Sequence, residues 1–327
     1  MYKISYLKIG CLLIGSIFLS RINAQTETRK YSSDKTDVEY SVTKGMLNGK
    51  YISYYKNGKK KAEGKFLFNN RVGEWSAWDS TGKLCMHRLY SNAFEFKSIM
   101  GKDTEGPAAL LNTPLYIPVR GADSCYKYYY LQERQVVWSK RTWSYIYYKD
   151  NKLLQENNRF FNVLYKQMYK HKLTAYKYNL DDWDMSFKDT IDITQAPFDT
   201  INYRVIGFLT KEDWFYNIDM GIMDYRVLGL CPLVVKKNEL NVKSDSLITK
   251  LCWIYYPRAR KYLAKENVSD VDYPSYIKNL DDIFFWKCYD SSICAESTVH
   301  GVSKVDNWQL RLRLIDAEHN TWLGTDW

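Results

Sequence analysis

The spacing of hydrophobic and polar positions changes along the chain, and each spacing predicts a type of element. Residues 159–170 repeat their apolar positions at helical spacing, which predicts an amphipathic helix. The apolar face of that helix contains Phe160, Val163, Leu164 and Met168. Runs rich in β-branched and apolar residues are typical of strands. These runs are residues 202–210, 224–235 and 251–256.

Signals for the ends of elements support the same division. Pro257 follows the third run and should end its strand, and residues 258–266 then have helical propensity. Asn279 is a suitable N-cap for a helix that includes residues 283–285. Residues 308–322 alternate apolar and polar positions briefly, as a strand does, and then lose the alternation. Strands and helices therefore interleave irregularly, which predicts an α+β fold.

An internal repeat with an offset of 24 residues precedes this region. The recurring pairs are Glu39 with Glu63, Gly49 with Gly73, Tyr51 with Trp75, Tyr54 with Trp78, Gly58 with Gly82, and Lys59 with Lys83. Each unit has the pattern of a β-hairpin, because Asn57 and Gly58 both tolerate the positive φ of a tight turn. A lone hairpin cannot bury its aromatics, so we expect stacked hairpins over residues 39–92. The glycines that we assign to the repeat turns are Gly49, Gly58, Gly73 and Gly82.

The repeat resembles the MORN type, in which a glycine, two spaced aromatics and an Asn-Gly-Lys or Thr-Gly-Lys turn recur at about this interval. MORN-like repeats imply an interaction module without chemistry of its own. A plain β-meander that only extends a sheet is the alternative. Near Phe94 the repeat stops, and glycines and prolines mark a loop-rich joint. Residues 93–327 form the predicted α+β domain.

Residues 1–24 have the pattern of an export signal. A basic start and an apolar stretch at residues 9–19 precede Ala24, the small residue that signal peptidase requires. The apolar stretch is too short to span a membrane. The residues before Cys11 do not form a lipobox, so we do not expect a lipid anchor. We expect a soluble mature chain outside the cytoplasm that begins with a linker at residues 25–38.

Charge and cysteine content refine this picture. The chain has 47 Lys and Arg against 37 Asp and Glu, which gives a formal net charge of +10. An exported protein is not expected to bind nucleic acid, and the basic residues are scattered. Six cysteines follow the predicted signal: Cys85, Cys125, Cys231, Cys252, Cys288 and Cys294. Disulfides are possible in an oxidising compartment, but a chain of this length does not need them, and buried free thiols are favoured.

No pattern of catalytic residues stands out in the sequence. Asp181, Asp182 and Asp184 form an acidic cluster, but this cluster lacks the glycine of a calcium loop. There is no Gly-x-Ser-x-Gly elbow and no phosphate-binding glycine motif. The four histidines are far apart in the sequence. We therefore expect no enzymatic activity, no metal and no cofactor.

Five segments of the second region, rich in aromatic and charged residues, resemble a known family when they are taken together. These segments are VVWSKRTWSYIYYKDNKL at 136–153, TAYKYN at 174–179, KEDWF at 211–215 with DYRVLGLCPL at 224–233, WIYYPRARKYLA at 253–264, and LDDIFFWKCYDSSICAES at 280–297. In this order they resemble the GldN/PorN family, a periplasmic component of the type IX secretion and gliding-motility machinery.

Nine residues of these segments are candidates for an interface or for the core. They are Trp138, Arg141, Trp143, Asp213, Trp214, Trp253, Tyr255, Tyr256 and Arg260. Residues 211–215 are compatible with a capped turn between strands or with a contact surface. Because a strand alternates its faces, Trp253 and Tyr255 should share one face and Tyr256 should lie on the other.

The resemblance implies a structural, non-catalytic subunit. Members of the family are held to assemble with an outer-membrane lipoprotein into a periplasmic ring that also contacts a trans-envelope motor component. The expected partners are therefore the lipoprotein, the motor component and further copies of the chain, at the inner face of the outer membrane. Two alternatives remain open: a divergent exported repeat protein of the cell envelope, and a periplasmic enzyme of unrecognised type.

Overall fold

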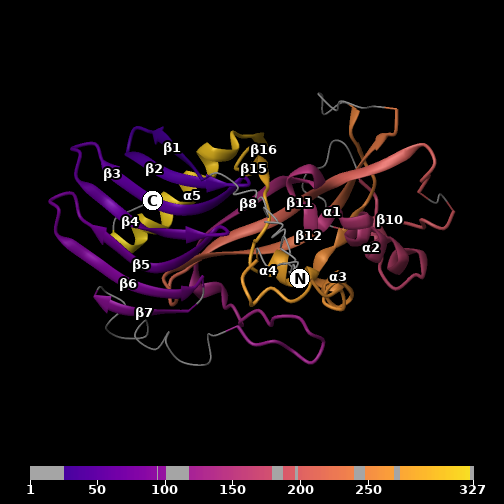
Figure 1. The fold of residues 1–327 in the computed structure, drawn as a ribbon, viewed down its shortest axis with the longest axis horizontal. Coiled ribbons are helices and arrows are strands. Elements are labelled where there is room, and N and C mark those ends of the chain that lie inside the picture. The colour runs from indigo at the N-terminus through magenta and orange to yellow at the C-terminus, as the bar shows by residue number, and fades with distance from the viewer. Residues whose placement is uncertain are drawn as a thin grey trace, which may run out of the picture.

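Two antiparallel sheets lie side by side in the computed structural model of the protein, as Figure 1 shows. The structure describes residues 26–93, 95–100, 118–178, 187–195, 198–238, 247–268 and 273–324. The expected export signal and the cluster of Asp181, Asp182 and Asp184 lie outside these residues. A hairpin sheet followed by a second sheet with several helices confirms the predicted α+β class.

The N-terminal sheet has seven strands in sequential order, each antiparallel to the next. Its strands are β1 (Glu27–Ser32), β2 (Thr36–Thr43), β3 (Met46–Tyr55), β4 (Lys60–Leu67), β5 (Asn70–Trp78), β6 (Leu84–Asn92) and β7 (Glu95–Met100). The stacked hairpins expected from the repeat are therefore present, and the sheet continues beyond the repeat at both ends.

The four repeat glycines occupy two kinds of position. Gly58 and Gly82 lie in the turns after β3 and β5, with φ of 79° and 90°, as predicted. Gly49 and Gly73, which we also assigned to turns, lie instead inside β3 and β5, with φ of 117° and 66°. At both places the pairing with the preceding strand skips residues, so the glycine is part of a β-bulge. A positive φ is needed in a bulge as well as in a turn, which explains the same residue type at both places.

The repeated aromatics form the buried face of the N-terminal sheet. Tyr51 and Trp75 occupy equivalent positions one repeat apart, both are 0% exposed, and their ring centroids are 5.8 Å apart. Phe66 lies next to both rings, with centroid distances of 5.6 and 5.0 Å. The 24-residue offset therefore reflects side-by-side stacking of rings on one face of the sheet.

The second sheet is built around three long strands. Its described strands are β8 (Val136–Tyr147), β9 (Ala175–Tyr176), β10 (Thr190–Ile191), β11 (Tyr203–Asn217), β12 (Ile222–Lys236), β13 (Thr249–Lys250), β14 (Trp253–Tyr255), β15 (Ser292–Thr298) and β16 (Gly301–Lys304). Along the sheet the order is β10, β9, β14, β12, β11, β8, β15 and β16, and β13 pairs with β12. The strand predicted at 202–210 extends to Asn217, so residues 211–215 are in a strand and the interpretation of them as a turn is wrong.

Five α-helices are described, and three of them match the sequence predictions. The helices are α1 (Lys152–Gln155), α2 (Arg159–Tyr169), α3 (Tyr256–Leu263), α4 (Leu280–Phe285) and α5 (Asn307–Leu323), with short 3-10 helices at Glu133–Gln135, Tyr148–Asp150 and Glu156–Asn158. Phe160, Leu164 and Met168 of α2 are buried, as the spacing predicts. Asn279 caps α4, because its side chain accepts a hydrogen bond from the N–H of Asp282.

Helix α5 joins the two sheets, and the alternation at 308–322 does not indicate a strand. On one side Lys61 of β4 donates a hydrogen bond of 2.5 Å to Asp316 of α5, and Arg71 of β5 pairs with Glu318. On another side Leu310 and Leu314 pack in a small cluster with residues of the second sheet. Because α5 is buried on several sides, its sequence has no single apolar face that could reveal a helix.

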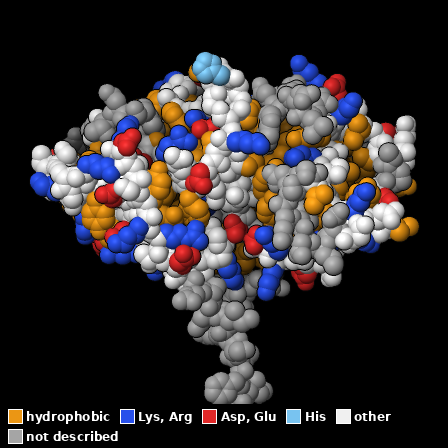
Figure 2. Space-filling view, turned by 90° about the horizontal axis from the view of Figure 1, so that it is seen from above, with side chains coloured by type: hydrophobic (Ala, Val, Ile, Leu, Met, Phe, Trp, Pro, Cys, Tyr) orange, Lys and Arg blue, Asp and Glu red, His pale blue; other side chains and the backbone are white. Residues whose placement is uncertain are grey.

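A single hydrophobic cluster extends from the repeat aromatics through α5 and into the second sheet and its helices. All six cysteines after the expected signal are free thiols, and four of them are buried, as favoured from the sequence. None of the helices in the described part of the chain has the length and apolar character needed to span a bilayer. Lys and Arg are interspersed with Asp and Glu on the face seen in Figure 2.

Candidate functional site

The first half of β8 forms a ridge between two surface grooves. This β8 ridge, residues 136–141, contains the opening residues of the first family-like segment. One groove has a volume of about 440 Å³ and contacts Ser139 and Arg141. The other has a volume of about 490 Å³ and contacts Trp138. Because successive residues of a strand point to opposite faces, the ridge presents part of its side chains to each groove.

An ion pair lies at the floor of the first groove. Arg141 of β8 and Asp213 of β11 are cross-strand neighbours and form two hydrogen bonds of 2.7 and 2.9 Å. The two side chains are 32% and 34% exposed. The structure therefore brings together two candidates that lie in separate segments of the sequence. At this exposure the pair adds little stability but offers charge and hydrogen-bonding groups to a partner.

The second groove combines apolar and charged groups. Trp138 packs with Leu310 and Leu314 of α5 at its floor. Beside Trp138, Lys140 donates a hydrogen bond of 2.7 Å to Glu296, which also accepts one of 3.1 Å from Arg313. This arrangement is typical of a protein contact site, where aromatic area lies next to charged groups.

The ridge is also a partly open strand edge. Strand β15 pairs with β8 only from Thr142 to Tyr145, and the N–H of Arg141 donates to the side chain of Ser297. The backbone groups of Ser139, two residues earlier, face the same side, where the described residues supply no further strand. Val137 on this ridge is 47% exposed. An open edge of this kind can pair with an extended segment of another chain.

Other candidates lie in the interior and support the fold. Trp143 and Trp253 are 1% and 2% exposed and belong to a second hydrophobic cluster on one face of the second sheet. Trp253 and Tyr255 both contact Phe187, so they share a face as predicted. Tyr256 is the first residue of α3 and is fully buried elsewhere in the core.

Trp214 borders a buried ion pair that the sequence reasoning did not identify. Lys287 donates a hydrogen bond of 2.6 Å to Glu212, and the Tyr289 hydroxyl donates one of 3.0 Å to the same carboxylate. Burial alone would raise the pKa of Glu212, but the Lys287 ammonium and these hydrogen bonds hold it below its usual value. Burial lowers the pKa of Lys287. The only sequence signal was that both charged residues lie inside family-like segments.

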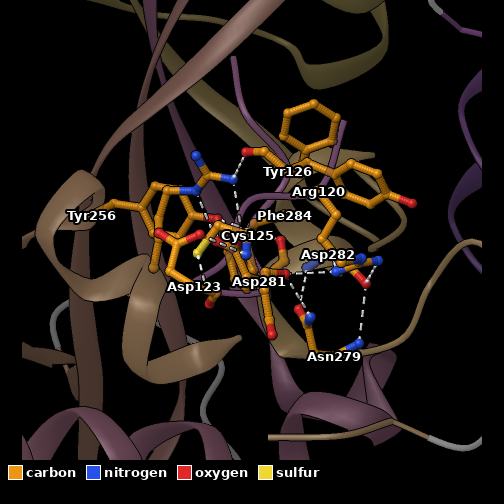
Figure 3. A network of polar contacts seen from close by, with 12 residues as sticks. Arg120, Asp123, Cys125, Tyr126, Tyr256, Asn279, Asp281, Asp282 and Phe284 are labelled. Carbon is orange, nitrogen blue, oxygen red and sulfur yellow. Dashed lines mark hydrogen bonds and ion pairs between the residues drawn. The ribbon is translucent and has the colours of Figure 1, made fainter. Parts of the chain in front are cut away.

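A second buried network, shown in Figure 3, surrounds the acidic pair at the start of α4. Arg260 of α3 donates two hydrogen bonds of 3.0 and 2.8 Å to Asp281, and the Tyr256 hydroxyl donates one of 2.6 Å to the same carboxylate. Arg260 also donates to the backbone oxygen of Tyr126. Burial opposes the charge of Arg260, but the groups around it raise its pKa above the usual value. Arg260 therefore positions α3, α4 and the segment near Tyr126.

The neighbouring carboxylate holds the same segment from the other side. Arg120 donates two hydrogen bonds of 2.9 and 2.8 Å to Asp282, and one of 2.7 Å to the backbone oxygen of Ser124. Burial raises the pKa of Asp282, although the Arg120 guanidinium acts in the opposite direction. The family-like acidic pair is thus a structural clamp on the segment that follows the joint.

The described residues contain no group of three or more His, Cys, Asp and Glu side chains that could hold a metal ion. The fully buried His319 has a pKa well below its usual value because of burial and the nearby Arg71 and Lys61. Its ring packs on Tyr51 and Trp75, which is a structural environment. His319 is therefore part of the core between the repeat sheet and α5.

Comparison with known proteins gives a family. The model of the family described as gliding motility associated protein GldN matches residues 131–322. A search of the curated proteins finds no match to the chain. The matched range begins just before β8 and ends within α5, so it contains the ridge, the Glu212–Lys287 pair and the carboxylates of the second network, whereas Arg120 and the repeat lie before it. The chain therefore belongs to the GldN family, whose members are components of the gliding-motility and type IX secretion machinery.

Proposed function

We propose that this protein is an exported, periplasmic subunit of the type IX secretion machinery that acts by binding other subunits. The partners in this proposal are an outer-membrane lipoprotein ring subunit, further copies of the chain in a ring, and the trans-envelope motor component. The family match supports this proposal. The nine-stranded sheet and its buried ion pairs then serve as a rigid support for the contact surface.

The β8 ridge is the part of the surface that we assign to the lipoprotein. It carries Trp138 and Arg141, it lies between two grooves, and it has an open backbone edge. Both side chains are partly exposed, and tryptophan and arginine are among the types that contribute most to protein contacts. The single observation that supports this assignment most strongly is that the opening family-like segment is the exposed ridge.

A substitution at Val137 tests the assignment without disturbing the core. Val137→Arg should reduce recovery of the lipoprotein in affinity purification from envelopes by at least about tenfold, because a cation on the open edge obstructs pairing. Ile201→Arg is the matched control, since Ile201 is 80% exposed and lines neither of the two grooves beside the ridge. Circular dichroism should show the same fold for both variants. Full recovery of the lipoprotein with Val137→Arg would contradict this site, and failure to recover it with the wild type would contradict the partner.

Export is tested separately. Mass spectrometry of the mature N-terminus should find Gln25 as the first residue, because Ala24 ends the signal pattern. An intact Met1 on the cell-associated protein would contradict the proposed location.

A further inference from the structure

A cavity lies where the N-terminal sheet, α5 and the second sheet meet. Its volume is about 90 Å³, which is enough for several water molecules or for a small ion with water. Charged residues from all three parts contact it: Arg71 from β5, Asp224 from β12, Lys287 from the chain after α4, and Arg311 and Glu318 from α5. Three cations and two carboxylates therefore line one enclosed space.

Two of the three cations have a carboxylate partner. Lys287 pairs with Glu212 at 2.6 Å, and Arg71 pairs with Glu318. The second carboxylate of the lining, Asp224, pairs with Arg226 outside the cavity. Arg311 is therefore the one cation of this lining with no carboxylate hydrogen-bonded to it among the described residues.

Arg311 is held by neutral groups. Its guanidinium donates hydrogen bonds of 3.1 Å to the side-chain oxygen of Asn69 and of 2.8 Å to the backbone oxygen of Ser291, and it lies 5.0 Å from the centroid of the Trp308 ring. The residue is only 6% exposed, and its Nε has no hydrogen-bond partner. No carboxylate of the described residues forms an ion pair with it.

The charges of Asp290 and Glu212 act on Arg311, but neither carboxylate forms a hydrogen bond or an ion pair with its guanidinium. Asp290 acts on Arg311 through its charge, but its carboxyl forms no hydrogen bond with the guanidinium and does not line the cavity. Burial raises the pKa of Asp290 to about 6, so its charge is itself unfavourable in this environment. Lys287 repels Arg311, as the lowering of the Lys287 pKa by Arg311 shows. Burial of a cation that has no hydrogen-bonded anion costs free energy. An N–H group of such a cation is a strong hydrogen-bond donor to an anion.

We propose that this cavity binds a small monovalent anion of about the size of chloride, together with water, at the Nε–H of Arg311. The ion would accept the hydrogen bond that the buried Nε–H of Arg311 does not make within the protein, and so stabilise the junction of the two sheets with α5. Nothing in this inference depends on the partner-binding function, because the cavity is separate from the β8 ridge.

Chloride dependence of the melting temperature tests the site in the whole mature chain. Sodium gluconate is replaced by sodium chloride at constant ionic strength, because gluconate is too large for the cavity. We expect a saturable rise in Tm of roughly 2–4 °C by about 300 mM chloride. The rise should disappear in Arg311→Gln. It should remain in Arg313→Gln, the matched control on the same helix, whose side chain is 51% exposed.

Crystals of the wild-type protein soaked in bromide give a second measurement that needs no variant. A peak of anomalous scattering within about 3.5 Å of Arg311 Nε would support the site. A melting temperature that does not respond to chloride, a chloride response that survives in Arg311→Gln, or bromide crystals without a peak in the cavity would each overturn the proposal.

Discussion

Replacement of Trp75 by alanine tests whether the repeat sheet and the family region unfold together. Trp75 is 0% exposed. Its ring centroid lies 5.0 Å from the ring centroid of Phe66 and 6.2 Å from that of Trp322 on α5. Its Nε1–H also donates a hydrogen bond of 3.1 Å to the backbone oxygen of Lys65. The side chain therefore connects the repeat to the last helix of the chain.

The expected loss of stability follows from these contacts. Removal of a buried tryptophan side chain costs about 3–5 kcal/mol. The upper part of that range applies here, because the ring packs directly on Gly64, which has no side chain to move into the space. With a urea m-value of about 3 kcal/mol per M, a loss of about 4.5 kcal/mol lowers the unfolding midpoint by about 1.5 M.

The measurement is equilibrium unfolding in urea, followed by far-UV circular dichroism and by tryptophan fluorescence. Because the hydrophobic cluster is continuous through α5, we expect one transition, shifted equally for both signals. Trp78→Ala is the matched control on the same strand, since Trp78 is only partly buried and should cost less than about 2 kcal/mol. Two separate transitions, of which only the first moves in Trp75→Ala, would refute the reasoning and show that the repeat folds by itself.

Two further substitutions have expected outcomes. Gly58→Val should destabilise the protein by about 1–2 kcal/mol in urea unfolding, because Gly58 has a φ of 79° and a β-branched residue disfavours that backbone conformation. Gly58→Asn should be nearly neutral, since asparagine tolerates a positive φ. Equal effects of the two variants would contradict this explanation. Burial raises the pKa of Asp290 to about 6, so the native state binds this proton more tightly than the unfolded chain, and stability should fall as pH rises from about 4 to about 6. Asp290→Asn should remove a slope worth roughly 2 kcal/mol between pH 4.5 and 7.5, and an unchanged slope would exclude Asp290 as its source.

Local signals explain which parts of the fold the sequence could predict. The turns at Gly58 and Gly82 depend on backbone conformations that few residues tolerate, so two glycines with the same offset identify them. The helix at Arg159–Tyr169 has one buried face and one exposed face, and this contrast appears directly in its spacing. Helix α5 is buried on several sides, so its spacing carries no such contrast.

Some residues of the candidate site could be predicted from the sequence, and others are known only from the structure. The family resemblance gave Trp138 and Arg141 as candidates, because both stand in its opening motif, but it did not separate interface from core. The clamp of Arg120 on Asp282 joins residues far apart in the chain, and no local pattern announces such a pair. Trp143 lies in the core and Trp138 lies at a groove. This difference depends on which face of β8 other elements cover, and the sequence alone does not show that.

The position of α5 at the end of the chain affects the order in which the protein can be completed. Strands β1–β7 are synthesised by Met100, yet the helix that covers Tyr51 and Trp75 ends at Leu323. At 5–20 residues per second, ribosomes need about 10–45 s to make the intervening chain. Until α5 is present, the aromatics of β1–β7 have nothing to cover them, and this segment is exposed to aggregation. A truncated chain that ends before residue 307 would remain in this condition permanently, so premature termination should produce a substrate for chaperones and proteases rather than a shorter working subunit.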